Sequence, residues 1–114
     1  MKSAKFWFGI ALSACVAVAY AHAHLKKSTP ADGSTITTSP PNVVLTLSEP
    51  ARLTGAWIQK DGAAKQKLGS LPDKPSAEIS VALPALTPGA YVVSWRAISD
   101  DGHVMPGAIH FTLH

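Results

Sequence analysis

The 114-residue sequence predicts an all-β fold, a small antiparallel β-sandwich of the immunoglobulin-like type. Three observations support this prediction. After residue 22 no helical period of any length occurs. Short segments rich in Val, Ile, Thr, Trp and Tyr are separated by Pro, Gly, Asp and Ser, which is the pattern of strands joined by turns. Six or seven such strands without crossover helices favour a sandwich over a barrel.

Six segments are expected to be strands, and they are residues 24–28, 43–47, 55–60, 77–82, 90–98 and 108–113. The last two alternate most clearly. Tyr91, Val93 and Trp95 share one face of the fifth strand, while Ser94 and Arg96 lie on the other. Such alternation places one face on a core and the other toward water. We therefore expect Tyr91 and Trp95 to pack in the core.

Turn residues connect these segments. Residues 30–33, 39–42, 60–62 and 87–89 supply Pro, Gly, Asp or Asn, which fix or free φ as a turn requires. Between residues 60 and 74 the charges are scattered and mixed in sign. This segment is therefore expected to be an exposed, solvated excursion.

The beginning of the chain has the layout of a secretory signal peptide. Two lysines precede an uncharged apolar run at residues 6–19, and Ala19-Tyr20-Ala21 fits an A-x-A cleavage site. We therefore expect a signal peptide at residues 1–21 and one domain at residues 22–114. The apolar run is shorter than the roughly 20 residues that a membrane span needs.

Two other cleavage positions stay open. Ala21-His22-Ala23 also fits the A-x-A pattern and would start the mature chain at His24. Leu12-Ser13-Ala14-Cys15 resembles a bacterial lipoprotein cleavage box, which would make Cys15 the lipidated first residue. Against this position, the apolar run continues past Cys15, so a leader cut there would have a short apolar region.

The exported chain differs in composition from the full sequence. The full sequence has ten Lys and Arg residues and seven Asp and Glu residues. Two lysines are removed with the leader, so the net charge falls to about +1. The basic balance therefore gives no reason to expect a nucleic-acid partner. Cys15 is the single cysteine, so the exported domain has no disulfide and no thiolate ligand. Its length suits one small domain, expected to be a monomer.

Cleavage before His22 would create a metal-binding group that the printed sequence does not show. The new α-amino group and Nδ1 of the same histidine can hold a metal in one chelate ring. His103 would add a second imidazole, and Asp101 a carboxylate nearby. Such donors in a tetragonal arrangement suit Cu(II), and less strictly Ni(II) or Zn(II). Because Met105 is the one methionine left after the leader, a soft Cu(I) site has few ligands.

Asp101 and His103 follow a predicted strand and lie two residues apart. On locally extended backbone both side chains would project to the same side. Gly102 between them allows backbone angles that other residues avoid. The spacing alone also fits an ordinary hairpin turn at residues 100–102 with a surface histidine beside it.

Other histidine arrangements compete with this site. The sequence His22-Ala23-His24 could form a square-planar chelate from a free amine, two ionised amides and an imidazole. If the residues from His24 onward pair in a strand, their amides are engaged in hydrogen bonds and are not available to ionise and bind the metal. His110 is explained by the outward face of a strand, and His114 is terminal. A Ser-His-Asp hydrolase is not supported, because the sequence has no Gly-x-Ser-x-Gly elbow.

Motifs along residues 22–114 resemble the CopC family of bacterial periplasmic copper-resistance proteins. They are His22-Ala23-His24-Leu25, Ser28-Thr29-Pro30-Ala31-Asp32-Gly33, Leu45-Thr46-Leu47-Ser48-Glu49-Pro50 and the block from Gly89 to His103, with Gly107 and Phe111 beyond. The block is the most specific of these motifs, because Trp95-Arg96-Ala97 leads into a Ser-x-Asp-x-His pattern at residues 99–103.

The resemblance implies a Greek-key β-sandwich that binds one Cu(II) per chain. The ligands that it implies are His22 as the mature N-terminal residue, Asp101 and His103, with His24 as an auxiliary candidate. Some family members carry a methionine-rich loop for Cu(I), but residues 60–74 contain no methionine. The chain therefore looks like a Cu(II)-only member. The resemblance also implies a membrane partner, an inner-membrane copper transporter.

The leading hypothesis is a periplasmic Cu(II) carrier or buffer in copper homeostasis and resistance, and not an enzyme. A copper monooxygenase with a histidine brace is the alternative from another class. Asp101 argues against it, because this carboxylate would fill a position that oxygen activation needs open. In addition, Trp57 is the one uncommitted aromatic for a substrate surface. A third hypothesis is a sandwich module for protein contacts, in which metal binding is incidental.

Overall fold

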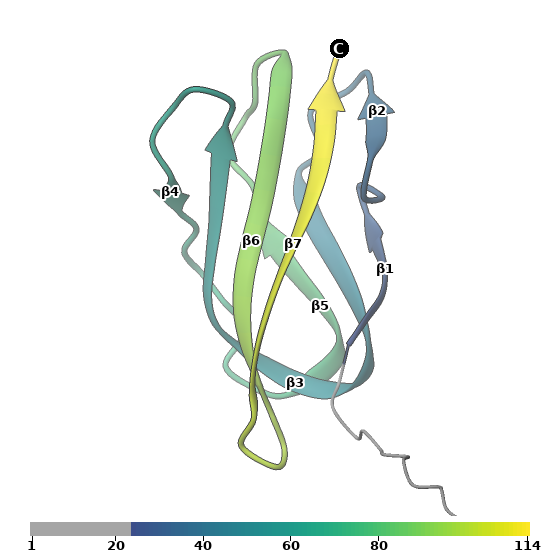
Figure 1. Cartoon of the computed structure of the whole chain (residues 1–114), viewed down its shortest axis with the longest axis vertical. Helices are drawn as coiled ribbons and strands as arrows, with labels where there is room; N and C mark the ends of the chain where they lie inside the picture. Colours follow the sequence, from purple (N-terminus) through teal and green to yellow (C-terminus); the bar gives the residue numbers. More distant parts are fainter. Residues whose placement is uncertain (1–23) are drawn as a thin grey trace, which may run out of the picture.

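The computed structural model describes residues 24–114, so the expected signal peptide and His22 lie outside the described residues. Within that range the protein is all β, with seven strands and no helix. The strands are β1 (Leu25–Thr29), β2 (Ser34–Ile36), β3 (Asn42–Lys60), β4 (Gln66–Lys67), β5 (Ser76–Ala82), β6 (Gly89–Ser99) and β7 (Val104–Leu113), as Figure 1 shows. This part of the chain therefore contains no helix that could span a membrane.

The fold is organised around β3, which takes part in both layers. Its first part, up to Leu47, pairs with β1 and β5. Its second part, from Ala51 onward, pairs with β6 and then with β4. Between the two parts the strand bends (Figure 1). One continuous hydrogen-bonded sheet thereby folds over into a three-stranded layer (β1, β3, β5) and a five-stranded layer (β4, β3, β6, β7, β2).

The five-stranded layer contains the long hairpin of β6 and β7. This hairpin is paired without interruption from Gly89 with Leu113 to Ile98 with Val104. On the other side of β7 lies β2, which runs parallel to it. The β-sandwich prediction is confirmed, and the β2–β7 pair is its one departure from antiparallel pairing. The departure has a topological cause, because the chain crosses from β1 in the other layer to reach β2 at the edge.

Alternating residues of the two layers face each other and form one core. The buried residues of the three-stranded layer are Val43, Leu45, Leu47, Ile79 and Val81, and those of the five-stranded layer include Leu53, Ile58, Tyr91, Val93, Trp95, Ile109, Phe111 and Leu113. Tyr91 and Trp95 are buried, as the sequence predicts. The ring of Tyr91 stacks on Phe111, and its hydroxyl donates to the Thr87 carbonyl oxygen at 2.6 Å.

Three features differ from the sequence prediction. The alternation predicts separate strands at residues 43–47 and 55–60, but both are parts of β3, because the chain between them stays extended through the bend. A bulge between Leu53 and Gly55 shifts the register there. The segment at residues 60–74 is predicted to be an exposed excursion, yet it contains β4 and the buried Leu68. The short β2 is likewise absent from the predicted strands.

Candidate metal centre

The loop between β6 and β7 carries both candidate ligands that the structure describes. Two backbone hydrogen bonds close it. The N–H of Gly102 donates to the Ser99 carbonyl oxygen at 2.9 Å, and the N–H of Ser99 donates to the His103 carbonyl oxygen at 3.0 Å. Gly102 has a φ of 87°, a left-handed conformation that favours glycine. The loop is therefore a tight turn and not the locally extended backbone that the spacing predicts.

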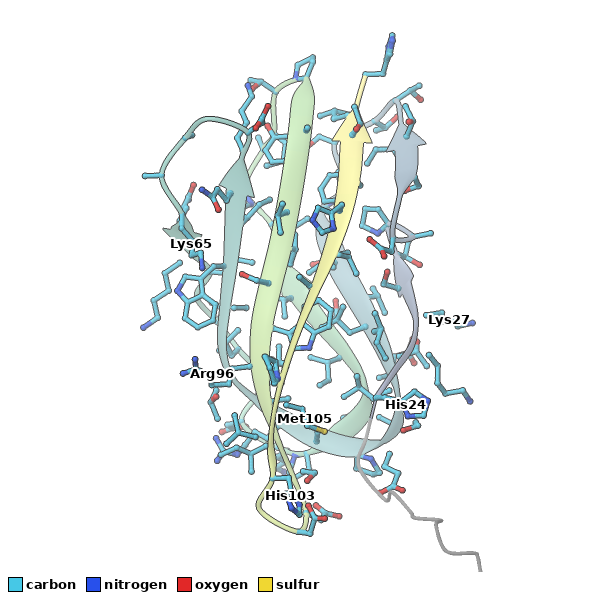
Figure 2. All side chains as sticks on the ribbon, in the orientation of Figure 1. His24, Lys27, Lys65, Arg96, His103 and Met105 are labelled. Atoms are coloured by element: carbon cyan, nitrogen blue, oxygen red, sulfur yellow. The ribbon has the colours of Figure 1, made fainter. Side chains whose placement is uncertain are left out.

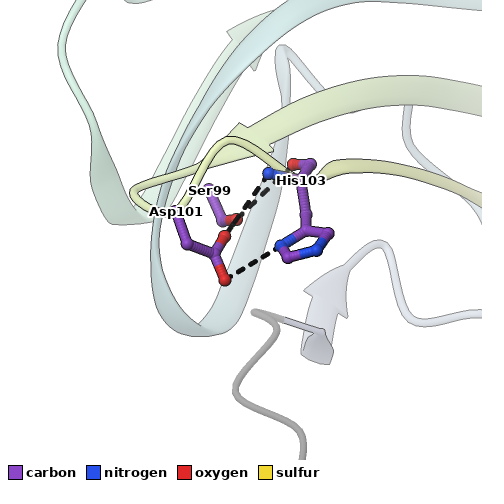
Figure 3. A network of polar contacts seen from close by, with 3 residues as sticks. All are labelled: Ser99, Asp101 and His103. Carbon is purple, nitrogen blue, oxygen red and sulfur yellow. Dashed lines mark hydrogen bonds and ion pairs between the residues drawn. The ribbon is translucent and has the colours of Figure 1, made fainter.

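Asp101 and His103 nevertheless face each other, because the turn brings them together (Figure 3). Nδ1 of His103 lies 2.9 Å from Oδ2 of Asp101. The backbone N–H of His103 donates to Oδ1 of Asp101 at 3.4 Å. The two side chains are 59% and 45% exposed for His103 and Asp101, so a metal ion from solution can reach them.

Ser99 completes this network, and sequence reasoning misses its role. Its side chain is buried at the end of β6, and its hydroxyl donates a short hydrogen bond to Oδ1 of Asp101. This hydrogen bond, followed by that from His103, holds the pKa of Asp101 well below its ordinary value. Asp101 is therefore a carboxylate at neutral pH. The Ser-x-Asp-x-His spacing contains the serine, but a one-dimensional pattern does not show that the turn folds Asp101 back onto it.

The described chain begins at the same end of the sandwich. The backbone N–H of His24 donates to Oγ of Ser48 at 2.9 Å, and the N–H of Ser48 donates to the His24 carbonyl oxygen at 2.8 Å. His24 also lines a small hollow of about 140 Å³ together with Met105, which is two residues beyond His103. Figure 2 shows His24, Met105 and His103 toward one end of the molecule. The start of β1 and the β6–β7 loop thus share that end.

The backbone of His24 bears on the competing square-planar chelate. That chelate requires an ionised His24 amide, whereas in the structure this amide donates a hydrogen bond to Ser48. Forming the chelate would break this bond and detach the start of the chain from β3. The structure therefore gives a physical reason to rank the chelate of His22-Ala23-His24 second.

The described residues hold part of the predicted ligand set. Within residues 24–114 no three His, Cys, Asp or Glu side chains gather closely enough to hold a metal ion. Asp101 and His103 supply one carboxylate and one imidazole, donors that fit Cu(II). The remaining two nitrogen donors of the predicted set belong to His22, which lies outside the described residues. The complete site remains a prediction.

The other two histidines lie outside the β6–β7 loop. Nδ1 of His110 is 3.6 Å from Oδ1 of Asp32, and the His110 N–H donates to the same oxygen at 2.8 Å. His110 is exposed on the outer face of β7, as the sequence predicts. The N–H of His114 donates to the Ile36 carbonyl oxygen at 2.8 Å. His110 thus offers a histidine–aspartate pair that serves as an internal control for the candidate centre.

Sequence comparison matches this chain to known proteins over most of its length. Residues 25–114 match the CopC domain. Copper resistance protein C of Pseudomonas syringae pv. tomato is 34% identical over 108 residues, which cover 85% of this chain and 84% of that protein. Protein YobA of Escherichia coli (strain K12) is 30% identical over 99 residues, which cover 82% of this chain and 78% of that protein.

Solved structures with the same fold give a concordant result. CopC from Methylosinus trichosporium OB3b has a TM-score of 0.69 at 27% identity, covering 81% of this chain and 93% of that chain. PcoC from Escherichia coli, a methionine-rich copper resistance protein, has a TM-score of 0.61 at 28% identity, covering 82% of this chain and all of that chain. The agreement of sequence and fold over nearly all described residues shows that this protein belongs to the CopC family of copper-resistance proteins.

Proposed function

We propose that the protein is a periplasmic carrier or buffer for Cu(II), which binds one ion per chain through His22, Asp101 and His103. The observation that carries the proposal is the exposed pair of Asp101 and His103, held in a tight turn at the end of the sandwich where the described chain begins. A signal peptide cut before His22 would add an amine and an imidazole beside that pair.

Each ligand has a distinct role in the proposed site. The carboxylate of Asp101 supplies negative charge beside the cation, and the Ser99 hydrogen bond keeps it ionised. Asp101 also fixes the orientation of the His103 ring by its contact with Nδ1. His22 would contribute the α-amino nitrogen and Nδ1, which together form one chelate ring. This set of nitrogen and oxygen donors favours Cu(II) over the softer Cu(I).

The related proteins support copper as the cargo, and the sequence supports its oxidation state. Relatives of this chain are named as copper resistance proteins, and PcoC is described as methionine-rich. This chain has no methionine between residues 60 and 74, and Met105 is the one methionine in residues 22–114. The partner that we propose is a copper transporter of the inner membrane, to or from which the protein passes its ion.

A Cu(II) titration of the exported protein tests the proposal, after its intact mass has fixed the first residue. We expect one tight Cu(II) per chain, and loss of tight binding in His103→Ala and after acetylation of the N-terminal amine. His110→Ala is the matched control, because it removes the imidazole of the other histidine–aspartate pair and should leave binding unchanged. Affinity should fall as the pH is lowered, because the bound imidazoles and the amine must be neutral.

Three outcomes would contradict the proposal. Unchanged binding in His103→Ala would exclude the site. Weak, non-stoichiometric binding that is insensitive to the terminal amine would favour an interaction module with incidental metal. Release of peroxide by the copper protein in the presence of a reductant would favour the histidine-brace enzyme.

A further inference from the structure

The outer face of the five-stranded layer is built from cross-strand rows of residues. The register of β4, β3, β6 and β7 gives three successive rows, which are Arg52–Ile98–Val104, Gly55–Arg96–Pro106 and Lys67–Trp57–Ser94–Ala108. The first row adjoins the loop that carries Asp101 and His103, because Ile98 and Val104 form the last pair of the hairpin. Residues paired across strands place their side chains on the same face.

The part of this face nearest the β6–β7 loop carries positive charge, and its three rows contain no carboxylate. It ends at the next row, Gln59–Val92–His110, where Asp32 lies beside His110. Three members of the rows are cationic, and none is Asp or Glu. A fourth cation, Lys65, lies with Nζ 5.7 Å from the ring centre of Trp57. The ion pairs found within residues 24–114 join histidines to aspartates, so these four cations take part in none of them. We call Arg52, Trp57, Lys65, Lys67, Arg96 and Val104 the outer basic face.

The outer basic face has low relief. The positions between its cations are small or compact, namely Gly55, Ser94, Pro106 and Ala108. The indole of Trp57 lies across Gly55, where a Cβ would come within 2.5 Å of the ring, so the ring lies along the sheet. Val104, the exposed large aliphatic residue of the described chain, is 55% exposed. A broad, flat partner can therefore approach this face closely.

We infer that the outer basic face docks on an anionic membrane surface. Phospholipid headgroups with negative charge complement four unpaired cations, and a bilayer is flat on the scale of one sheet. Lysine and arginine can lay their apolar stems along such a surface, and tryptophan favours the same interfacial depth. The outer face of the other layer is less suited, because Glu78 of β5 brings a carboxylate to it. Figure 2 shows Lys65 and Arg96 on the side of the molecule opposite to Lys27.

Docking in this way would bring the β6–β7 loop to the edge of the bilayer. The first row of the face ends at Val104, and His103 is the next residue toward the loop. A membrane transporter is the partner in the proposed function, so docking would raise the local concentration of the carrier near it. The docking itself does not depend on copper, and the two proposals can therefore fail separately.

Flotation of the exported protein with vesicles tests this inference. The vesicles are phosphatidylcholine alone or phosphatidylcholine with about one third phosphatidylglycerol, at low salt. We expect binding to the anionic vesicles alone, and its loss at roughly 0.5 M salt, where charges are screened. Lys65→Glu/Lys67→Glu should weaken binding by at least about ten-fold, since each basic side chain contributes roughly five-fold.

A matched charge control is available on the opposite layer. Lys26→Glu/Lys27→Glu makes the same change in net charge on β1 and should alter binding by less than about two-fold. Equal losses in both pairs would overturn the inference, because net charge alone would then explain binding. A blue shift of Trp57 emission on anionic vesicles, absent in Trp57→Phe, would support it, since Trp95 is buried.

Absence of flotation with anionic vesicles would overturn membrane docking and would point instead to an acidic protein surface as the partner. Thermal unfolding and Cu(II) titration of each variant separate the outcomes. If a variant folds and binds Cu(II) like the parent but loses vesicle binding, the docking face is supported. If vesicle binding is as expected but no chain binds Cu(II) tightly, docking stands and the proposed function falls.

Discussion

The hydroxyl of Ser99 determines how the candidate centre presents its charge. It is buried at the end of β6 and donates to Asp101, whose other oxygen contacts Nδ1 of His103. The chain of three residues thus fixes a carboxylate and an imidazole in one tight turn. Groups that orient metal ligands in this way contribute to metal affinity without touching the ion.

Removing this hydroxyl should weaken Cu(II) binding. In Ser99→Ala, Asp101 loses the hydrogen bond that contributes most to lowering its pKa, and the carboxylate is less well oriented. We expect Cu(II) affinity to fall by roughly 10-fold, the lower end of the range for such supporting residues. Competition titration with a chelator measures this change. Ser94→Ala, on the outer face of β6, should leave affinity unchanged; an equal fall there would mean that the effect does not come from the loop.

The lowered pKa of Asp101 also predicts a pH dependence of stability. Because the folded-state pKa lies below the ordinary value of 3.8, ionised Asp101 stabilises the folded state above about pH 3.8. This contribution is lost as the pH falls below that value. Asp101→Asn should therefore lose less stability than the parent between pH 5 and pH 2, as urea unfolding at each pH would show. Asp73→Asn, which removes an exposed carboxylate, should lose as much stability between pH 5 and pH 2 as the parent does. If Asp101→Asn also loses as much as the parent, the hydrogen bonds do not stabilise the Asp101 carboxylate.

Sequence reasoning proposes Asp101 and His103 as ligands but does not show which residue orients them. Asp101 and His103 are candidates because both residue types bind metals and lie two residues apart after a clear strand, although this spacing alone also fits an ordinary hairpin turn and the family resemblance is needed to favour a metal site. Their mutual contact depends on the left-handed Gly102 and on the buried end of β6, which are three-dimensional facts. The role of Ser99 is therefore visible in the structure and not in the pattern.

At the scale of elements, the alternation of apolar and polar residues predicts a strand where the strand is long and regular enough to show the period. β6 and β7 were predictable because their buried residues recur at every second position over most of their length. β3 is harder, because its bend and its bulge interrupt the alternation, and the pattern breaks it into two strands. β2 and β4 have three and two residues, too few to show a period. Their positions are set by tertiary pairing with β7 and β3.

The burial of Leu68 shows that the segment around β4 belongs to the core. Its N–H donates to the Ala56 carbonyl oxygen at 2.8 Å, and its side chain is 3% exposed. Leu68→Ala should lower the free energy of unfolding by about 2–4 kcal/mol, because it leaves a cavity in a packed core. Chemical denaturation measures this loss. Leu71→Ala, in the same segment but half-buried, should cost less than half as much; similar costs would show that the segment does not pack as described.

At the scale of the whole molecule, the two layers depend on one strand. β3 supplies the central pairing of the three-stranded layer and also the pairing that connects it to β6. The candidate metal centre lies at one end of the sandwich, and the outer basic face covers one side of it. In the two proposals, metal binding and membrane docking would therefore use different surfaces of the same fold.

This arrangement predicts one cooperative unfolding transition. The emission of Trp95 reports on the five-stranded layer, and hydrogen exchange of β5 amides reports on the other layer. Because both layers lose their partner when β3 detaches, the two probes should give the same midpoint in urea. An earlier loss of protection in β5 would show that the three-stranded layer opens alone, contrary to this expectation.

Because β3 belongs to both layers, the two layers are joined through its hydrogen bonds and are not separate halves that can move apart. If the protein is the proposed carrier, it would hold the ion at its surface, without two halves that close over the ion and open to release it. In the proposed function, the ion would be transferred at the exposed end of the sandwich. A ligand of the receiving protein would take one coordination position of the ion while residues of this protein still occupy the others. Transfer would then proceed by stepwise replacement of ligands, and its speed would follow how readily this end is reached and not how readily the sandwich deforms.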